Sequence, residues 1–256
     1  MALYDSIGRT YADYRRPEPR IAAAINRALG DAASVINVGA GTGSYEPPGK
    51  TSLAVEPSER MIAQRPADAA PCVIGTAEAL PVDSASVDAA MAILSVHHWT
   101  DPEAGLREMG RVARKRVVLL TWVPDSGSFW LTRDYFPEIM AHDRTIFPDS
   151  ETLGAMLTRL IGPTVITPLP IPHDCTDGVL CAYWRRPEAY LDEGTRSGIS
   201  SFARFDPSAG LDELADDLAS GRWTARNAGL MTLDSLDAGY RVAVCEIAGG
   251  EGAAHA

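Results

Sequence analysis

The residues with the clearest chemical meaning are three glycines that follow a short apolar run. The run is Val35–Val38, and the glycines stand at alternate positions, Gly39, Gly41 and Gly43. Glycine lets the backbone turn tightly and approach a ligand without an intervening Cβ. Thirteen residues after Gly43, at the end of the next apolar run, Glu56 is placed to accept hydrogen bonds from both hydroxyls of a ribose. This spacing predicts a nucleoside-containing ligand at the carboxyl edge of a parallel sheet.

Two familiar nucleotide-binding loops match the glycines incompletely. A dinucleotide-binding loop has a third glycine or alanine at the position of Ser44. Gly49-Lys50-Thr51 ends like a P-loop, but the first glycine of that motif would again be Ser44, and no strand leads into it. The glycine spacing therefore favours neither of these two loops.

Two adjacent histidines are the best candidates for proton transfer. His97 and His98 come just after the apolar run Val87–Leu94, so we expect them at the sheet edge that carries the glycine loop. An ordinary imidazole pKa of about 6.5 suits removal of a proton near neutrality. The alternative is that the pair caps the strand and packs on Trp99. If one of the two is the base, we slightly favour His98.

Apolar runs and polar or helical stretches alternate from about Ser34 to Trp122, and they must position these residues. Continuous apolar runs are typical of strands buried on both faces, and strand–helix alternation indicates a parallel sheet. Thr164–Pro168 and Tyr240–Ile247 add two later strands. We therefore predict an α/β fold with a mostly parallel, seven-stranded sheet and helices on both faces. The other strands and a helix are expected at Val35–Val38, Leu53–Val55, Cys72–Ile74, Val87–Leu94, Val117–Trp122 and, for the helix, Asp101–Arg114.

Five segments resemble, in order and spacing, the class I S-adenosylmethionine-dependent methyltransferases. They are Gly39–Gly43, Ala54–Ser58 with Met61, Gly75–Pro81, Ser86–Asp88 with Val96–Trp99, and Glu108–Val112. The resemblance runs from about Tyr4 to Trp122 and is to the small-molecule branch, which includes ubiquinone and menaquinone biosynthesis enzymes. It implies a Rossmann-like domain, S-adenosyl-L-methionine as cofactor and S-adenosyl-L-homocysteine as product.

The resemblance also implies which residues contact the cofactor. An N-terminal helical lead-in would fold over it, so that Tyr14 or Arg16 reaches its carboxylate, unless this segment only packs on the sheet. The remaining contacts implied are Gly39, Ala40, Gly41, Thr42, Gly43, Glu56, Pro57, Ser58, Met61, Thr76, Ala77, Glu78 and Ile93.

Several positions depart from the family pattern. Asn37 and Thr76 stand where many relatives have an acid, and only Ser44–Thr51 connects the glycine loop to the second strand. We expect at most a turn or two of helix in this short connection. These departures leave a noncatalytic cofactor-binding or regulatory protein as the alternative. A nicotinamide-dependent oxidoreductase is disfavoured by Ser44 and by Gly75–Pro81.

The expected organisation is a single methyltransferase domain. It comprises a lead-in (1–33), a cofactor-binding core (34–122), a helical lid and substrate region (123–238) with one core strand near 164–168, a last strand (239–248) and a tail (249–256). The lid is rich in aromatic residues, and we expect Trp122, Phe129 and Trp130 to line the acceptor pocket, although aromatic residues at helical spacing are more often core.

Composition narrows the class of partner. The 256 residues carry 23 basic and 34 acidic side chains, a formal charge of −11, which disfavours nucleic acid and anionic membranes. The four cysteines lack metal-site spacing. We therefore expect a cytoplasmic protein without a metal, acting on a neutral or cationic small-molecule methyl acceptor, with O-methylation favoured over C- or N-methylation. The sequence does not indicate an oligomeric state.

Overall fold

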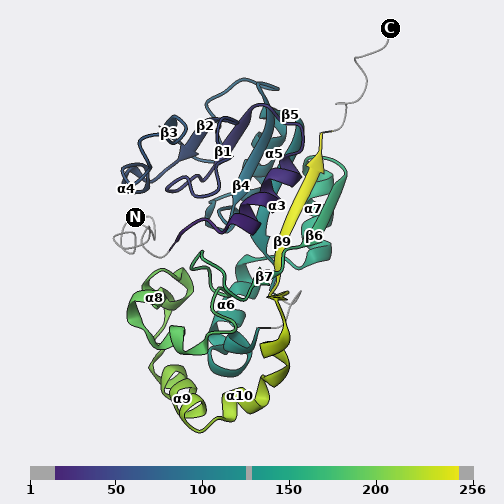
Figure 1. Cartoon of the computed structure of the whole chain (residues 1–256). Coiled ribbons are helices and arrows are strands. Elements are labelled where there is room, and N and C mark those ends of the chain that lie inside the picture. The colour runs from purple at the N-terminus through teal and green to yellow at the C-terminus, as the bar shows by residue number, and fades with distance from the viewer. Residues whose placement is uncertain (1–14, 125–128, 248–256) are drawn as a thin grey trace.

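The computed structural model describes residues 15–124 and 129–247, and its centre is one seven-stranded sheet (Figure 1). The strand order is β3-β2-β1-β4-β5-β9-β6, in which β1 to β5 are parallel and β9 runs antiparallel to β5 and β6. The predicted Rossmann-like sheet is thereby confirmed. The strands are β1 (Val35–Val38), β2 (Thr51–Glu56), β3 (Cys72–Ile74), β4 (Val87–Ile93), β5 (Ala113–Trp122), β6 (Thr164–Pro168) and β9 (Tyr240–Glu246).

Helices cover both faces of the sheet because the central strands are apolar on both sides. On one face, Val117 and Leu119 of β5 pack in the cluster that includes Leu106 of α5 and Leu157 of α7. On the other face, Leu120 joins the cluster that includes α3 and the lid. These helices are α3 (Pro19–Leu29), α5 (Pro102–Val112) and α7 (Ser150–Leu160), with the short α4 (Glu59–Ile62) after β2.

Local sequence explains where these helices begin. Pro19 opens α3, and the Glu18 carboxylate caps it by accepting a hydrogen bond from the Arg20 amide. Asp101 caps α5 through the Ala104 amide. A side-chain oxygen at this position satisfies an otherwise unpaired N–H of the first helical turn. Residues 40–50, by contrast, form consecutive turns without a helix, as the short connection to β2 predicts.

A helical lid lies beyond the carboxyl ends of the parallel strands (Figure 1). We use the word lid for residues 129–147 and 171–236. The expected lid region, 123–238, is predicted to contribute one strand, β6, to the core. Because α7 packs with α5 against the sheet, α7 also belongs to the core. The lid elements are η2 (Leu131–Tyr135), α6 (Pro137–Ile146), β7 (Ile171–Pro172), η3 (Pro187–Leu191), α8 (Glu193–Ser197), η4 (Ser200–Arg204), α9 (Ser208–Ala219), α10 (Arg222–Arg226), η5 (Ala228–Thr232) and β8 (Ser235–Leu236).

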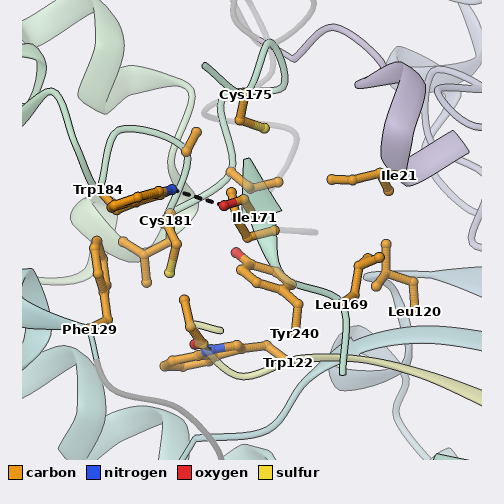
Figure 2. Close-up of a cluster of buried hydrophobic side chains, with 14 of the residues drawn as sticks. Ile21, Leu120, Trp122, Phe129, Leu169, Ile171, Cys175, Cys181, Trp184 and Tyr240 are labelled. Carbon is orange, nitrogen blue, oxygen red and sulfur yellow. Dashed lines mark hydrogen bonds between the residues drawn. The ribbon is translucent and has the colours of Figure 1, made fainter. Parts of the chain in front are cut away.

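The lid has an aromatic core of its own, and this corrects one sequence-based expectation. Phe129 and Trp130 are 4% and 2% exposed and do not line the large cavity described below. The Trp130 indole N–H donates to the Trp184 carbonyl at 2.8 Å. The Trp184 indole N–H donates in turn to the Ile171 carbonyl at 2.9 Å, as Figure 2 shows. Buried indoles that find backbone acceptors in this way stabilise packing. These two side chains therefore belong to the lid core and not to an acceptor pocket.

Candidate active site

A cavity of about 610 Å³ lies between the sheet edge and the lid. Such a volume is in the range of small-molecule sites. It opens where the strand order reverses between β1 and β4, which is the usual ligand position in this kind of sheet. One half is walled by the glycine loop and the ends of β2 and β3. The other half is walled by η1 (Val96–His98), α6, the loop at 178–180, and η4 with the two residues before it. We call these the cofactor half and the acceptor half.

The conformation of the glycine loop requires glycine, because a residue with a side chain would be strained or would clash there. Gly39 and Gly41 have φ values of +68° and +53°, in the left-handed region. A Cβ on Gly39 would lie 2.6 Å from the Cβ of Ser95, whose hydroxyl donates to the Val38 carbonyl at 2.9 Å. Glycine at position 39 therefore lets β1 and the end of β4 approach each other beneath the cavity.

Glu56 is held in place by two backbone amides. Its Oε2 accepts a hydrogen bond from the Gly41 N–H at 2.8 Å, and its Oε1 accepts one from the Ser58 N–H at 2.9 Å. The residue is 7% exposed and lines the cavity. A carboxylate oxygen accepts more than one hydrogen bond, so each still has capacity for a ribose hydroxyl.

Glu78 follows β3 and is also oriented by backbone amides. Its Oε1 accepts hydrogen bonds from the amides of Thr100 at 2.9 Å and Asp101 at 3.1 Å. Burial raises the pKa of Glu78, but these and other hydrogen bonds outweigh it and leave the pKa below its ordinary value. Thr76 and Ala77 line the same wall of the cavity. This segment therefore carries a fixed anion and a neutral hydroxyl beside the cofactor half.

Asn37 presents an unsatisfied acceptor to the cofactor half. Its Nδ2 donates to Glu46 Oε1 at 3.0 Å, and Glu46 pairs in turn with Arg65 at 2.8 Å. Among the residues that the structure describes, no group donates a hydrogen bond to the buried Asn37 Oδ1, and Asn37 lines the cavity. Buried polar atoms are rarely left unpaired, so this carbonyl suits an N–H or ammonium donor on a bound ligand.

The histidine pair reaches the cavity with altered acidity. The two rings lie 3.8 Å apart by centroid, and the His97 ring lies 4.6 Å from that of Phe147. Burial lowers the pKa of His98 to about 4, assisted by the positive charge of Arg204. Burial likewise lowers the pKa of His97 well below its ordinary value, assisted by His98 and Arg204. Both imidazoles are therefore neutral at pH 7, and both are weaker bases than the expected ordinary value implies.

An arginine one position before the expected one reaches the cavity. Arg15 lines it, whereas Arg16 is exposed and does not. The Arg15 guanidinium bonds Asp177 at 2.5 Å, and the Tyr45 hydroxyl donates to the same carboxylate at 2.7 Å. Asp177 belongs to the lid, so these contacts join the lid to the lead-in and to the loop after β1.

The cavity gathers most of the residues that the sequence assigned to it. Trp122 lines it, as do twelve of the expected cofactor contacts, whereas Gly43 lies outside its wall and Tyr14 falls outside the described residues. The twelve are Gly39, Ala40, Gly41, Thr42, Glu56, Pro57, Ser58, Met61, Thr76, Ala77, Glu78 and Ile93. Sequence reasoning missed Arg15, Tyr45, Asp143, Phe147, Arg204 and Tyr240.

Two kinds of feature are absent from the described residues, namely a metal-binding cluster and a membrane-spanning helix. Over 15–124 and 129–247, no cluster of three or more His, Cys, Asp or Glu side chains is arranged to hold a metal ion. No helix within those same ranges is long and apolar enough to cross a membrane.

Comparison with known proteins places this arrangement among methyltransferases. A family model described as a methyltransferase domain matches residues 36–121. An uncharacterised methyltransferase of Mycobacterium tuberculosis (strain H37Rv) is 34% identical over 139 residues, which cover 50% of this chain and 53% of that protein. The chain thus spans about half the length of the curated relatives it matches.

Solved structures extend the similarity over the whole fold. A crystal structure from Anabaena variabilis, described as a methyltransferase from an antibiotic biosynthesis pathway, is 34% identical and has a TM-score of 0.83. The match covers 91% of this chain and 98% of that one. A methyltransferase structure from Thermotoga maritima covers 96% of this chain and 98% of its own, with a TM-score of 0.59 and 16% identity, which shows the fold alone.

Proposed function

Because the chain belongs to the S-adenosylmethionine-dependent methyltransferases of class I fold, we propose that it transfers a methyl group from S-adenosyl-L-methionine to a small-molecule acceptor. We further propose that the methylated atom is an oxygen rather than a carbon or nitrogen. The single observation that carries the cofactor assignment is Glu56, a carboxylate fixed by Gly41 and Ser58 at the end of β2.

The cofactor half offers each chemical group of the cofactor a suitable partner. Glu56 accepts from the ribose hydroxyls, and the segment Thr76–Glu78 lies where the adenine would be placed. The orphaned Asn37 carbonyl accepts from the cofactor's ammonium group. The N–H groups of Gly39, Ala40, Gly41 and Gly43 donate to acceptors of the protein itself, which leaves the Thr42 N–H of the glycine loop for the carboxylate. S-adenosylmethionine supplies the electrophilic methyl group when bound.

The protein's own part in methyl transfer is orientation and exclusion of water. In-line displacement at a methyl carbon requires the nucleophile, carbon and sulfur to be aligned, and holding them so supplies much of the rate. His98 lines the acceptor half and is neutral at pH 7, so its ring can accept a hydrogen bond from an acceptor hydroxyl as the oxygen attacks. The aromatic faces of Trp122 and Phe147 stabilise nearby positive charge.

Calorimetric titration tests the cofactor assignment directly. We expect S-adenosylhomocysteine to bind with a dissociation constant of about 1–100 μM and NAD not to bind. Binding of NAD in place of S-adenosylhomocysteine would overturn the proposal.

Turnover separates methyl transfer from noncatalytic binding. A screen of phenols, enols and amines with labelled S-adenosylmethionine should give an O-methylated product. The His98→Gln and His97→Gln variants then test proton acceptance on that acceptor, which typically contributes about 100- to 10,000-fold. Full turnover in both variants would show that neither histidine acts as a base.

A further inference from the structure

A single buried carboxylate in the acceptor half lacks a protein partner. Asp143 lies on α6, is 6% exposed and lines the cavity. Within residues 15–124 and 129–247, no hydrogen bond or ion pair joins its carboxylate to another group. Burial of an unpaired carboxylate is costly unless something else compensates the charge. The group is therefore arranged for a partner that the protein does not itself provide.

The cations and histidines around Asp143 do not neutralise it. The positive charge that acts on Asp143 is that of Arg204 of η4, whose side chain is exposed and whose Nη1 lies 2.8 Å from His142 Nε2. Burial raises the pKa of Asp143 to about 6, with Arg204 acting in the opposite direction. His97 and His98 of η1 are neutral at pH 7. At pH 7 the Asp143 carboxylate is thus mostly ionised and unpaired.

The walls around this carboxylate are aromatic and apolar. Phe147 follows Asp143 by one helical turn, and its amide N–H donates a hydrogen bond to the backbone carbonyl of Asp143 at 2.8 Å. The Phe147 ring meets Trp122 edge to face at 5.8 Å. Tyr240, which lies beside Trp122 (Figure 2), also lines the cavity. Aromatic faces attract a cation, most strongly where water is excluded. One anion within such walls is a binding site for a positively charged organic group.

We infer that Asp143 binds a protonated amine of the methyl acceptor, so that the acceptor is a small cationic molecule with a separate hydroxyl as its methylated group. The inference rests on the proposed function, because it names the acceptor class for the same cavity. An ammonium held by a carboxylate keeps its proton and has no lone pair to attack with, so the nucleophile is another atom of the acceptor. The chain's net charge of −11 favours the approach of such a cation.

The experiment compares matched amines and alcohols on the cofactor-loaded protein. The wild type, Asp143→Asn and Glu138→Gln are each titrated with S-adenosylhomocysteine, then with phenethylamine against phenethyl alcohol, tyramine against tyrosol, and cyclohexylmethylamine against cyclohexylmethanol. Glu138 is the matched control, because it lies on α6 but is exposed and outside the cavity. Asp143→Ser is a second neutral variant, and circular dichroism confirms that each variant is folded.

We expect equal S-adenosylhomocysteine affinity in all the variants and at least one amine that binds more tightly than its alcohol by about tenfold or more, as for a charge-assisted hydrogen bond. Asp143→Asn and Asp143→Ser should abolish this preference, and Glu138→Gln should keep it. No amine preference in any pair, or a preference that survives both Asp143 variants, overturns the inference. A parallel titration with S-adenosylmethionine supplies a further check. If the Asp143 variants lose affinity for S-adenosylmethionine but keep their affinity for S-adenosylhomocysteine, the inference is overturned, since Asp143 would then serve the sulfonium. Failure of the wild type to bind S-adenosylhomocysteine overturns the proposed function instead.

Discussion

Gly41 and Glu56 are joined by a hydrogen bond of 2.8 Å from the backbone amide of the loop after β1 to the carboxylate at the end of β2. Fifteen residues separate them in sequence, yet the contact makes the loop and the acid one unit. The orientation of the carboxylate is set by the same loop that must turn around the cofactor. Replacement of Glu56 should therefore disturb both ribose recognition and the loop.

Glu56→Ala should weaken S-adenosylhomocysteine binding by about 1–3 kcal/mol, which corresponds to roughly 5- to 150-fold. The loss arises because the carboxylate accepts hydrogen bonds from the ribose and from the Gly41 amide. Isothermal titration calorimetry measures it. Glu56→Gln keeps one side-chain oxygen and should fall between the wild type and Glu56→Ala. Unchanged affinity in Glu56→Ala would show that the ribose lies elsewhere.

Gly39 and Gly49 have similar backbone conformations but different surroundings, so comparing their alanine variants separates the effect of a clash from the effect of backbone strain. Gly39 and Gly49 have φ values of +68° and +73°, but a Cβ on Gly39 would lie 2.6 Å from the Ser95 Cβ, whereas none of the surrounding atoms lies within 4 Å of a Cβ on Gly49. Both Gly→Ala changes incur about 1–2 kcal/mol for the left-handed conformation. Only Gly39→Ala should also displace the end of β4 and weaken S-adenosylhomocysteine binding. Equal affinity in the two variants, measured by calorimetry, would contradict this account.

The sheet could be predicted from the sequence because its central strands are continuous apolar runs. Such strands must be buried on both faces, which is the arrangement of a parallel sheet covered by helices. β6 has the predicted bounds, Thr164–Pro168, and β5 begins four residues early at Ala113. Its start pairs with neighbouring strands at Ala113 and at Arg116, on either side of a register shift, and side-chain polarity does not reveal this backbone pairing. The family resemblance predicted the cofactor half for the same reason, because the residues of that half directly follow these strands.

The acceptor half could not be predicted, because its residues converge from separate lid elements. Asp143 lies on a helix that also carries exposed polar side chains, so in sequence it is indistinguishable from a solvated position. Phe129 and Trp130 are aromatic residues near the same segment, yet they pack inward on Trp184 because their partners come from later lid segments. Arg15 rather than Arg16 reaches the cavity because it pairs with Asp177, 162 residues away.

Asp177 should be a principal anchor of the lid. Its side chain is 2% exposed and is bonded by Arg15 and Tyr45. Asp177→Ala removes one partner of a buried ion pair and should lower the free energy of unfolding by about 3–5 kcal/mol. Denaturant unfolding followed by circular dichroism measures the change. The control Glu103→Gln breaks the exposed pairs with Arg107 and Arg159 and should leave the unfolding midpoint unchanged. Similar midpoints for Asp177→Ala and the wild type would mean that the lid is held elsewhere.

The histidine pair should make the folded state sensitive to acid. The pKa of His98 is about 4 and that of His97 lies well below its ordinary value, both because burial disfavours the charged ring. In the unfolded chain each has a pKa of about 6.5. As the pH falls below about 6.5 the unfolded state binds protons that the folded state refuses, so stability decreases, whereas above about 6.5 the pair has no such effect.

Replacement of the histidines isolates this effect. Chemical unfolding between about pH 7.5 and pH 5 should show a steeper loss of stability in the wild type than in His97→Gln, because glutamine does not titrate. His98→Gln should likewise reduce the slope, because the folded-state pKa of His98, about 4, also lies below this pH range. Parallel slopes in the wild type and both variants would show that the two imidazoles titrate normally in the folded protein.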